Sequence, residues 1–477
     1  TMATSRGPRT HVPARLHPDG VQPLTSVGAY EDRLPRQLGF WGTTALTVGL
    51  IVGSGIFRVP GAIAADSGSV GRIAFVWIAG GAIALCGALS LAELGAMFPR
   101  SGGIYVFLRE AYGPPVAFLW GWTALVVLPA SGAALSLFFA EYFSTLVPLT
   151  PTGTRLFAMT VILGVATVCF LSTRWMNALQ GTTTVAKLMA LAGIVALAFV
   201  LGNGADGALA KASLAPQPTG ASVDDQASWG RLGVALIAAL YAYNGWHTLS
   251  YVAGEVRDPG RTYPRAVLAG MAIVLTTYLV VNGAYLYVLS VDALSQSPLV
   301  AADVMHRVLG SRGSAVVSAL VMVSAFGTLT ANVLTQPRLF YAMARDGLFF
   351  RQLAAVHQRF HTPHFAIAFI AVTAIALVAL RTWDQLRELL IVGAWPFIAL
   401  AVLAVPVLRR HHPEISRPYR TPGYPFVPLA FVAASLAVLG NITVQHPGST
   451  LASFGFTLLG IPVYLAWRVA HRHHAVA

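Results

Sequence analysis

The chain has 477 residues, of which 56% are hydrophobic and only 10% are charged. A soluble globular protein carries roughly 25% charged residues, so this composition excludes an ordinary water-soluble domain. The net charge of +13 would favour nucleic acid binding in a soluble protein, but basic residues also gather in the cytoplasmic loops of membrane proteins. We therefore expect a lipid bilayer around the chain and no nucleic acid partner.

Long apolar segments predict membrane-spanning helices, because about 20 apolar residues cross a bilayer as an α-helix. The alternating segments of a membrane β-barrel do not occur in the sequence. The predicted helices cover residues 38–65, 71–98, 115–147, 154–172, 175–202, 229–255, 264–290, 313–344, 363–380, 384–408, 425–444 and 450–470. The fold class is an all-α integral membrane protein with twelve transmembrane helices.

The remaining segments are polar. We expect residues 1–35 to form a disordered cytoplasmic tail, residues 203–228 an extracellular loop, and residues 471–477 a second cytoplasmic tail. With the N-terminus inside, 21 of the 31 lysines and arginines lie in cytoplasmic segments and 9 lie outside. Because basic residues favour the cytoplasmic side, both termini are predicted to be cytoplasmic in a plasma (inner) membrane.

Two predicted helices contain glycine near their centres. The first reads Leu50-Ile-Val-Gly-Ser-Gly-Ile-Phe57, and the sixth contains Asn244-Gly245. Glycine costs about 1 kcal/mol inside a helix, and these helices open two groups of five, residues 36–202 and 229–408. Breaks at matching places favour a five-plus-five inverted repeat with its site at mid-membrane, followed by two further helices in 409–470. Close helix packing through Gly49-xxx-Gly53 is the alternative explanation.

A helix that breaks inside a bilayer exposes unpaired amides on one side of the break and unpaired carbonyls on the other. The amides attract an anion, helped by the helix dipole, and the carbonyls attract a cation. An α-amino acid carries a carboxylate and an ammonium a few ångströms apart. The breaks therefore favour an amino acid as substrate over a sugar, which would require many side-chain hydrogen bonds.

Five motifs follow one another along the chain. They are Gly53–Phe57, Glu93–Tyr105, Tyr241–Trp246, Glu255–Pro259 with Tyr263–Arg265 after it, and Arg417–Arg420. Together they resemble the amino acid–polyamine–organocation superfamily, and most closely the L-type amino acid transporters and their bacterial homologues. The resemblance implies the five-plus-five fold and amino acid transport by alternating access.

The resemblance also implies a set of substrate-binding residues: Ile51, Gly53, Ser54, Gly55, Tyr241, Asn244 and Trp246. The amides of Ser54 and Gly55 would bind the carboxylate, while the carbonyls of Ile51, Tyr241 and Asn244 would bind the ammonium. Tyr241 would also cover the pocket, and the tryptophan would line it. Since L-type relatives usually have glycine in place of Asn244, we expect a narrower pocket that disfavours large aromatic substrates.

Lys187 is the only lysine inside a predicted span. A charge there costs at least ~2.5–3.5 kcal/mol, and its depth of about 15 Å along the helix is too great for the ammonium to reach the interface. In similar sodium-independent transporters a lysine of the fifth helix occupies the place of a sodium ion. This implies bonds to carbonyls near Gly53, with Ser324 or Thr328 as further partners. Protonation of the lysine coupled to transport is the alternative.

The sequence also contains other charged residues within the predicted helices, among them Arg58, Glu93 and Glu255. Arg58 follows the first break and either faces the external vestibule or pairs with Asp66 or a lipid headgroup. Glu93 and Glu255 have arginine neighbours at cytoplasmic helix ends, so we expect them to be structural.

Several functions are excluded by missing patterns. The sequence has no Gly-x-x-x-x-Gly-Lys-Ser/Thr loop, so ATP is not the energy source. No metal-ligand or nucleophile pattern occurs either, and we expect no cofactor, no metal and no enzymatic activity. The two cysteines, Cys86 and Cys169, lie in apolar spans. Because loop 147–155 has no cysteine where eukaryotic relatives attach a subunit, we expect no disulfide-linked heavy chain and a prokaryotic protein.

The favoured function is sodium-independent exchange of neutral L-amino acids. Proton-coupled symport with Lys187 as the titrating group is the second interpretation. A cationic amino acid or polyamine carrier is the third, and it would be expected to offer acidic residues at mid-membrane. A channel would leave continuous polar faces through the spans, which the sequence does not show.

Overall fold

The computed structural model describes residues 36–171, 173–210, 225–360, 362–445 and 447–472. Its α-helices are α1 Phe40–Ile51, α2 Gly55–Ser67, α3 Val70–Met97, α4 Ile104–Tyr112, α5 Pro114–Ser144, α6 Pro151–Leu171, α7 Thr173–Leu201, α9 Asp225–Ala242, α10 Pro259–Val288, α11 Val291–Ser295, α12 Val300–Thr335, α13 Pro337–Arg345, α14 His364–Leu380, α15 Trp383–His411, α16 Phe426–Gln445 and α17 Pro447–Arg472. Short 3-10 helices are η1 Gly204–Asp206, η2 Trp246–Glu255 and η3 Arg351–Ala354. The predicted tail 1–35, residues 211–224 of the predicted loop and residues 473–477 lie outside the described residues.

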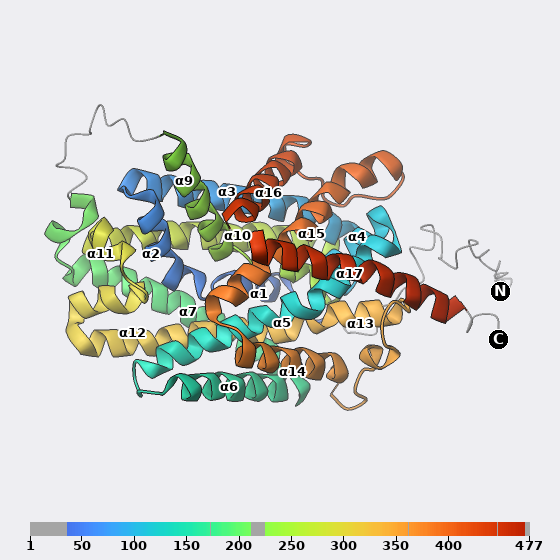
Figure 1. Ribbon diagram of the computed structural model, residues 1–477, viewed down its shortest axis with the longest axis horizontal. Helices are drawn as coiled ribbons and strands as arrows, with labels where there is room; N and C mark the ends of the chain where they lie inside the picture. The colour runs from blue at the N-terminus through green and yellow to red at the C-terminus, as the bar shows by residue number, and fades with distance from the viewer. Residues whose placement is uncertain (1–35, 172, 211–224, 361, 446, 473–477) are drawn as a thin grey trace, which may run out of the picture.

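Most long helices lie side by side along the longest axis of the molecule (Figure 1). In the described part of the chain, nine helices are long and apolar enough to cross a membrane. The pair α1 and α2, bent by 43°, meets the same criteria when it is taken as one span. Large apolar side chains such as Val372 on α14 and Leu451 on α17 are about 70% exposed on the outer surface. Since water would make so much exposed apolar surface costly, the chain is a multi-pass membrane protein.

The two predicted breaks occur in the structure and touch each other. α1 ends at Ile51 and α2 begins at Gly55, while α9 ends at Ala242 and η2 follows after Gly245. Gly245 has φ +119°, and a Cβ there would lie 2.4 Å from the carbonyl oxygen of Leu50. A Cβ on Gly55 would lie 2.6 Å from the Cα of Ala242. The close approach of the two segments therefore requires glycine at both positions. At Gly245 the positive φ is a second reason.

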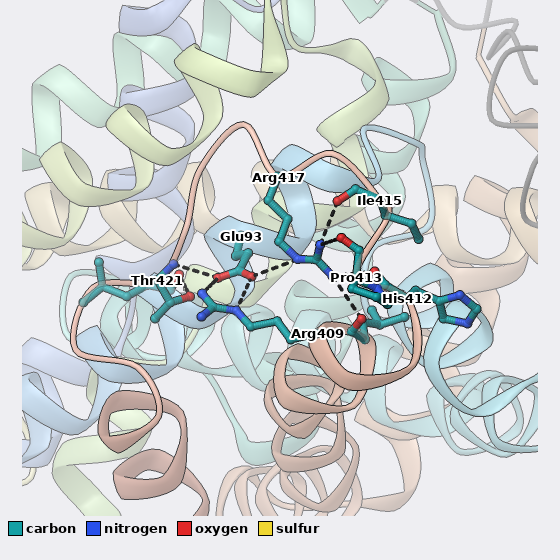
Figure 2. Close-up of polar contacts among 9 residues, drawn as sticks. Glu93, Arg409, His412, Pro413, Ile415, Arg417 and Thr421 are labelled. Carbon is teal, nitrogen blue, oxygen red and sulfur yellow. Dashed lines mark hydrogen bonds and ion pairs between the residues drawn. The ribbon is translucent and has the colours of Figure 1, made fainter.

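Two buried carboxylates join helices through ion pairs with arginine. Glu93, near the C-terminal end of α3, accepts hydrogen bonds from Arg409 Nε at 2.9 Å and Nη2 at 2.7 Å, and from the amide of Thr421 at 2.7 Å (Figure 2). Glu255, the last residue of η2, accepts from Arg338 Nε at 3.0 Å. Both carboxylates are structural ion-pair partners in this arrangement.

Arg417 organises the loop between α15 and α16 beside this cluster. Its guanidinium donates to the carbonyls of residues that precede it, as Figure 2 shows: Leu408 at 3.0 Å, His412 at 2.7 Å, Pro413 at 3.0 Å and Ile415 at 2.7 Å. Arg409 also lies over the ring of Tyr424, 3.9 Å from its centroid. The loop is thereby held against the ends of α3 and α15.

Glu93→Gln should destabilise the protein, because it leaves Arg409 without its buried charge partner. Breaking a buried pair costs roughly 3–5 kcal/mol, and we expect roughly 2–4 kcal/mol here because the side chain of Arg409 is 20% exposed. The Tm of the purified protein in detergent should fall by several degrees. Glu414→Gln is the matched control, since that carboxylate is 66% exposed beside His412 and an exposed pair contributes little. A wild-type Tm for Glu93→Gln would contradict this assignment.

Candidate functional site

The two breaks meet at the centre of the helix packing. α1 packs against α7, α10 and α12, and α2 packs against α9. In the part of the chain that the structure describes, the amides of Gly53, Ser54 and Gly55 donate no hydrogen bond. All three residues are buried, although an unsatisfied amide away from water costs several kcal/mol. These amides form a ready anion site at the start of α2.

The carbonyl groups at the breaks are partly satisfied by one tyrosine. The hydroxyl of Tyr278, a fully buried residue of α10, lies 3.1 Å from the carbonyl oxygen of Ile51 and 3.0 Å from that of Ala242. This side chain bridges the ends of α1 and α9. Sequence reasoning missed Tyr278, because a tyrosine within an apolar span carries no local signal of its role.

A cavity opens between the breaks and α5, α12 and α15. It offers about 70 Å³ to the centre of a water molecule, whereas roughly 10–15 Å³ suffices for one water, so it has room for a small polar molecule. Of the seven predicted substrate-binding residues, the structure brings six to its wall: Ile51, Gly53, Ser54, Gly55, Tyr241 and Asn244. The unpaired amides thus border an interior space.

The side chains of two predicted residues shape this cavity. The hydroxyl of Tyr241 lies 3.4 Å from Ser54 Oγ, across the two breaks. Asn244 Oδ1 accepts from the amide of Gly245 at 3.0 Å, so the asparagine holds its own break in shape as well as lining the cavity. Another part of the wall is polar, where Asn332 Nδ2 donates to Ser131 Oγ at 2.7 Å. Sequence reasoning missed this last pair, which joins α5 and α12 over 201 residues of chain.

Trp246 does not line the cavity, contrary to the expectation. It is 4% exposed and packs edge-on against Phe431 of α16, and a Cβ on Gly87 would lie 2.5 Å from its ring. The left-handed Gly245 that precedes it turns the chain at this point. The tryptophan therefore fills the space between η2, α3 and α16.

Lys187 is fully buried and reaches the first break. Its Nζ donates to the carbonyl of Gly49 at 3.1 Å, the carbonyl of Val52 at 2.7 Å and Thr328 Oγ1 at 2.9 Å. Of the two expected hydroxyl partners only Thr328 contacts it. The hydroxyl of Ser324 has no hydrogen-bond partner in the described part of the chain, because it lies one helical turn away.

Arg58 has a different partner from those expected. Its Nη1 lies 2.5 Å from Glu141 Oε2 on α5, and its guanidinium lies 4.0 Å from the ring centroid of Trp383, the first residue of α15. Asp66 is not among its contacts. Tyr241 meets the same Trp383 ring edge-on at 5.9 Å, so these aromatic and charged side chains join α2, α5, α9 and α15 next to the cavity.

No group of three or more metal-ligating side chains occurs within the described ranges.

The chain is similar to known amino acid transporters over most of its length. The sequence profile described as "Amino acid permease" matches residues 38–466. The serine/threonine exchanger SteT of Bacillus subtilis is 32% identical over 91% of this chain and 97% of its own length. The b(0,+)-type amino acid transporter 1 of Mus musculus is 32% identical over 90% of this chain and 88% of its own. The human cystine/glutamate transporter is 31% identical, with 92% and 86% covered.

These matches extend over nearly the whole chain and over most of each relative. The relatives are transporters and exchangers of amino acids, not enzymes. A bent helix pair, unpaired amides at its break and an adjoining cavity are features that such a protein needs. The chain is an amino acid transporter that belongs to the amino acid permease family, within the amino acid–polyamine–organocation superfamily and related to its L-type transporters.

Proposed function

We propose that the chain exchanges neutral L-amino acids across the plasma membrane by alternating access, without sodium. The observation that carries the proposal is the row of unpaired amides at Gly53, Ser54 and Gly55 beside the cavity. Those of Ser54 and Gly55 bind the substrate carboxylate. The ammonium binds the carbonyls of Ile51, Tyr241 and Asn244, since a carbonyl oxygen can accept a second hydrogen bond.

The neutral specificity is supported by the cavity wall. No aspartate or glutamate is among the described residues that line it, so nothing there would pair with a second positive charge on a substrate. This argues against the cationic amino acid or polyamine carrier. Among the relatives, the serine/threonine exchanger by its name acts on small neutral amino acids.

We infer the absence of a sodium requirement from Lys187. Its ammonium already donates to two carbonyls of the first break and to Thr328, which are oxygen atoms of the kind that a sodium ion would need. Proton-coupled symport through Lys187 remains the second candidate function, because the same ammonium could release a proton during the cycle.

The repeat architecture belongs to the same proposal. Twelve spans would form two groups of five, in residues 36–202 and 229–408, followed by two more, with both termini cytoplasmic. The breaks at α1–α2 and α9–η2 support it, since they lie in the first helix of each group. α14 has 17 residues, a length at the lower end of the range for membrane-spanning helices. The absence of cysteine from residues 147–155 supports a chain that works without a disulfide-linked partner.

Sodium independence and exchange can be tested in one assay with the purified chain alone in proteoliposomes. Uptake of labelled L-serine should be severalfold faster when the vesicles contain unlabelled L-serine. It should stay the same when choline replaces sodium, because Lys187 supplies the cation. A tenfold lower uptake in choline medium would refute the proposal that Lys187 takes the place of sodium. Uptake into empty vesicles that requires an inward proton gradient would instead favour symport, and an inactive purified chain would argue for a missing partner.

Thr328→Val should impair transport, because it removes the hydroxyl that Lys187 contacts while keeping the side-chain volume. A hydrogen bond to a charged group contributes about 1.5–3 kcal/mol, so we expect at least a tenfold loss of uptake. Ser324→Ala is the matched control, since it removes a buried but unbonded hydroxyl from the same helix and should leave uptake unchanged. Equal uptake by the two folded variants would count against the role of Thr328.

Asn244→Gly should relax the restriction on substrate size. The change removes a side chain from the cavity wall, and room for one methylene is worth roughly 1–3 kcal/mol in an apolar pocket. The variant also loses the bond from the Gly245 amide, and we expect this loss to lower the overall rate of transport. The measurement is therefore the ratio of leucine to alanine uptake in one preparation, which should rise severalfold. An unchanged ratio in folded protein would show that Asn244 does not limit substrate size.

A further inference from the structure

A long apolar groove runs along the outer surface of the molecule between α7 and α12, away from the substrate cavity. Its volume is about 650 Å³. The floor is made by small residues of α7, namely Ala186, Ala190 and Gly193. A Cβ on Gly193 would meet nothing within 4 Å, so the groove is open at this point. Met189 and Val316, on its two sides, are 68% and 60% exposed.

A bend in α12 shapes one end of the groove. Gly310 has φ +69° and ψ −160°, which separates residues 300–309 from the rest of the helix. Glycine adopts this conformation without the strain that a side chain would cause. Met305 and Leu309 before the bend and Val317 after it all line the groove. Both arms of the helix therefore line this end of the groove, which we call its mouth.

Arg312 is the one charged residue among those that line the groove in the described part of the chain, and the others are all apolar. It lies two residues after Gly310 at the bend, is exposed, and makes no hydrogen bond or ion pair with the residues that the structure describes. A guanidinium is a strong ligand for a phosphate group. The site thus offers a cation at the mouth and hydrocarbon surface along its length.

The length of the groove fits one half of a bilayer. From Ala186 to Leu197 it covers twelve residues of α7, a rise of about 17 Å along the helix, while half of the hydrocarbon core measures about 15 Å. Ala186 precedes Lys187, which contacts the break at the centre of the molecule. The groove therefore extends from the mid-depth of the protein to the end where α12 begins.

We propose that this groove binds an anionic phospholipid, with its phosphate on Arg312 and one acyl chain along the small residues of α7. The charge at the mouth selects an anionic lipid over a zwitterionic one. The apolar floor accepts the acyl chain whatever its exact length. Lipid binding in this groove depends neither on the identity of the substrate nor on the mode of transport.

The test uses the full chain in phosphatidylcholine nanodiscs that contain a little photoactivatable phosphatidylglycerol with a diazirine in its acyl chain. Crosslinked peptides are then located by mass spectrometry. Labelling should concentrate on residues 186–197 and 305–320, and Arg312→Gln should reduce it about fivefold. Gly193→Leu should displace the acyl chain from the groove and reduce labelling as strongly. The matched controls are Arg307→Gln, an exposed arginine of α12 outside the groove, and Gly164→Leu, an exposed glycine of α6.

The controls should label like the wild type, and all variants should keep its Tm. A photoactivatable phosphatidylcholine should label the groove several times less. Equal labelling by the two lipids, or undiminished labelling of Arg312→Gln, would overturn the proposal. So would crosslinks from this face to a second copy of the chain in place of lipid.

Discussion

The structure depends on one demand of the bilayer, namely that backbone groups without water must find partners inside the protein. The break after Ile51 frees carbonyls, and Lys187 satisfies those of Gly49 and Val52. Placing its charge there costs at least ~2.5–3.5 kcal/mol, while its three hydrogen bonds contribute about 1.5–3 kcal/mol each. The bonds therefore outweigh the cost. Lys187 thus satisfies the carbonyls of Gly49 and Val52. The carbonyl of Ile51 and the amides of Gly53, Ser54 and Gly55 border the cavity.

The same demand couples the two breaks to each other. At Gly55 and Gly245 the two broken helices approach each other so closely that a methyl group on either residue would clash with backbone atoms. Tyr278 then holds the carbonyls of Ile51 and Ala242 with one hydroxyl. Because these contacts are shared, a movement of α1 that opened the site would also disturb α9. A substrate that contacts both breaks would strengthen this existing contact between α1 and α9.

The parts of the site that could be predicted from sequence are those with local signals. Glycine inside an apolar span and a lone lysine at mid-depth are each unusual enough to point to a break and its cation. The direction of individual side chains could not be predicted in this way. Ser324 and Thr328 lie one turn apart on the same helix face, so spacing alone could not choose between them. The partner of Arg58 is Glu141, 83 residues away, and only the fold brings the two together.

The central claim is that the broken helices bind the head group common to all α-amino acids. Its most direct test is the Tm of the purified protein in sodium-free buffer with L-serine, with L-serinamide or with neither. A bound ligand stabilises the folded state by mass action, and the amides at Ser54 and Gly55 require a carboxylate. We predict that L-serine raises the Tm and that L-serinamide, which lacks the carboxylate, does not. An equal rise with both compounds would contradict it.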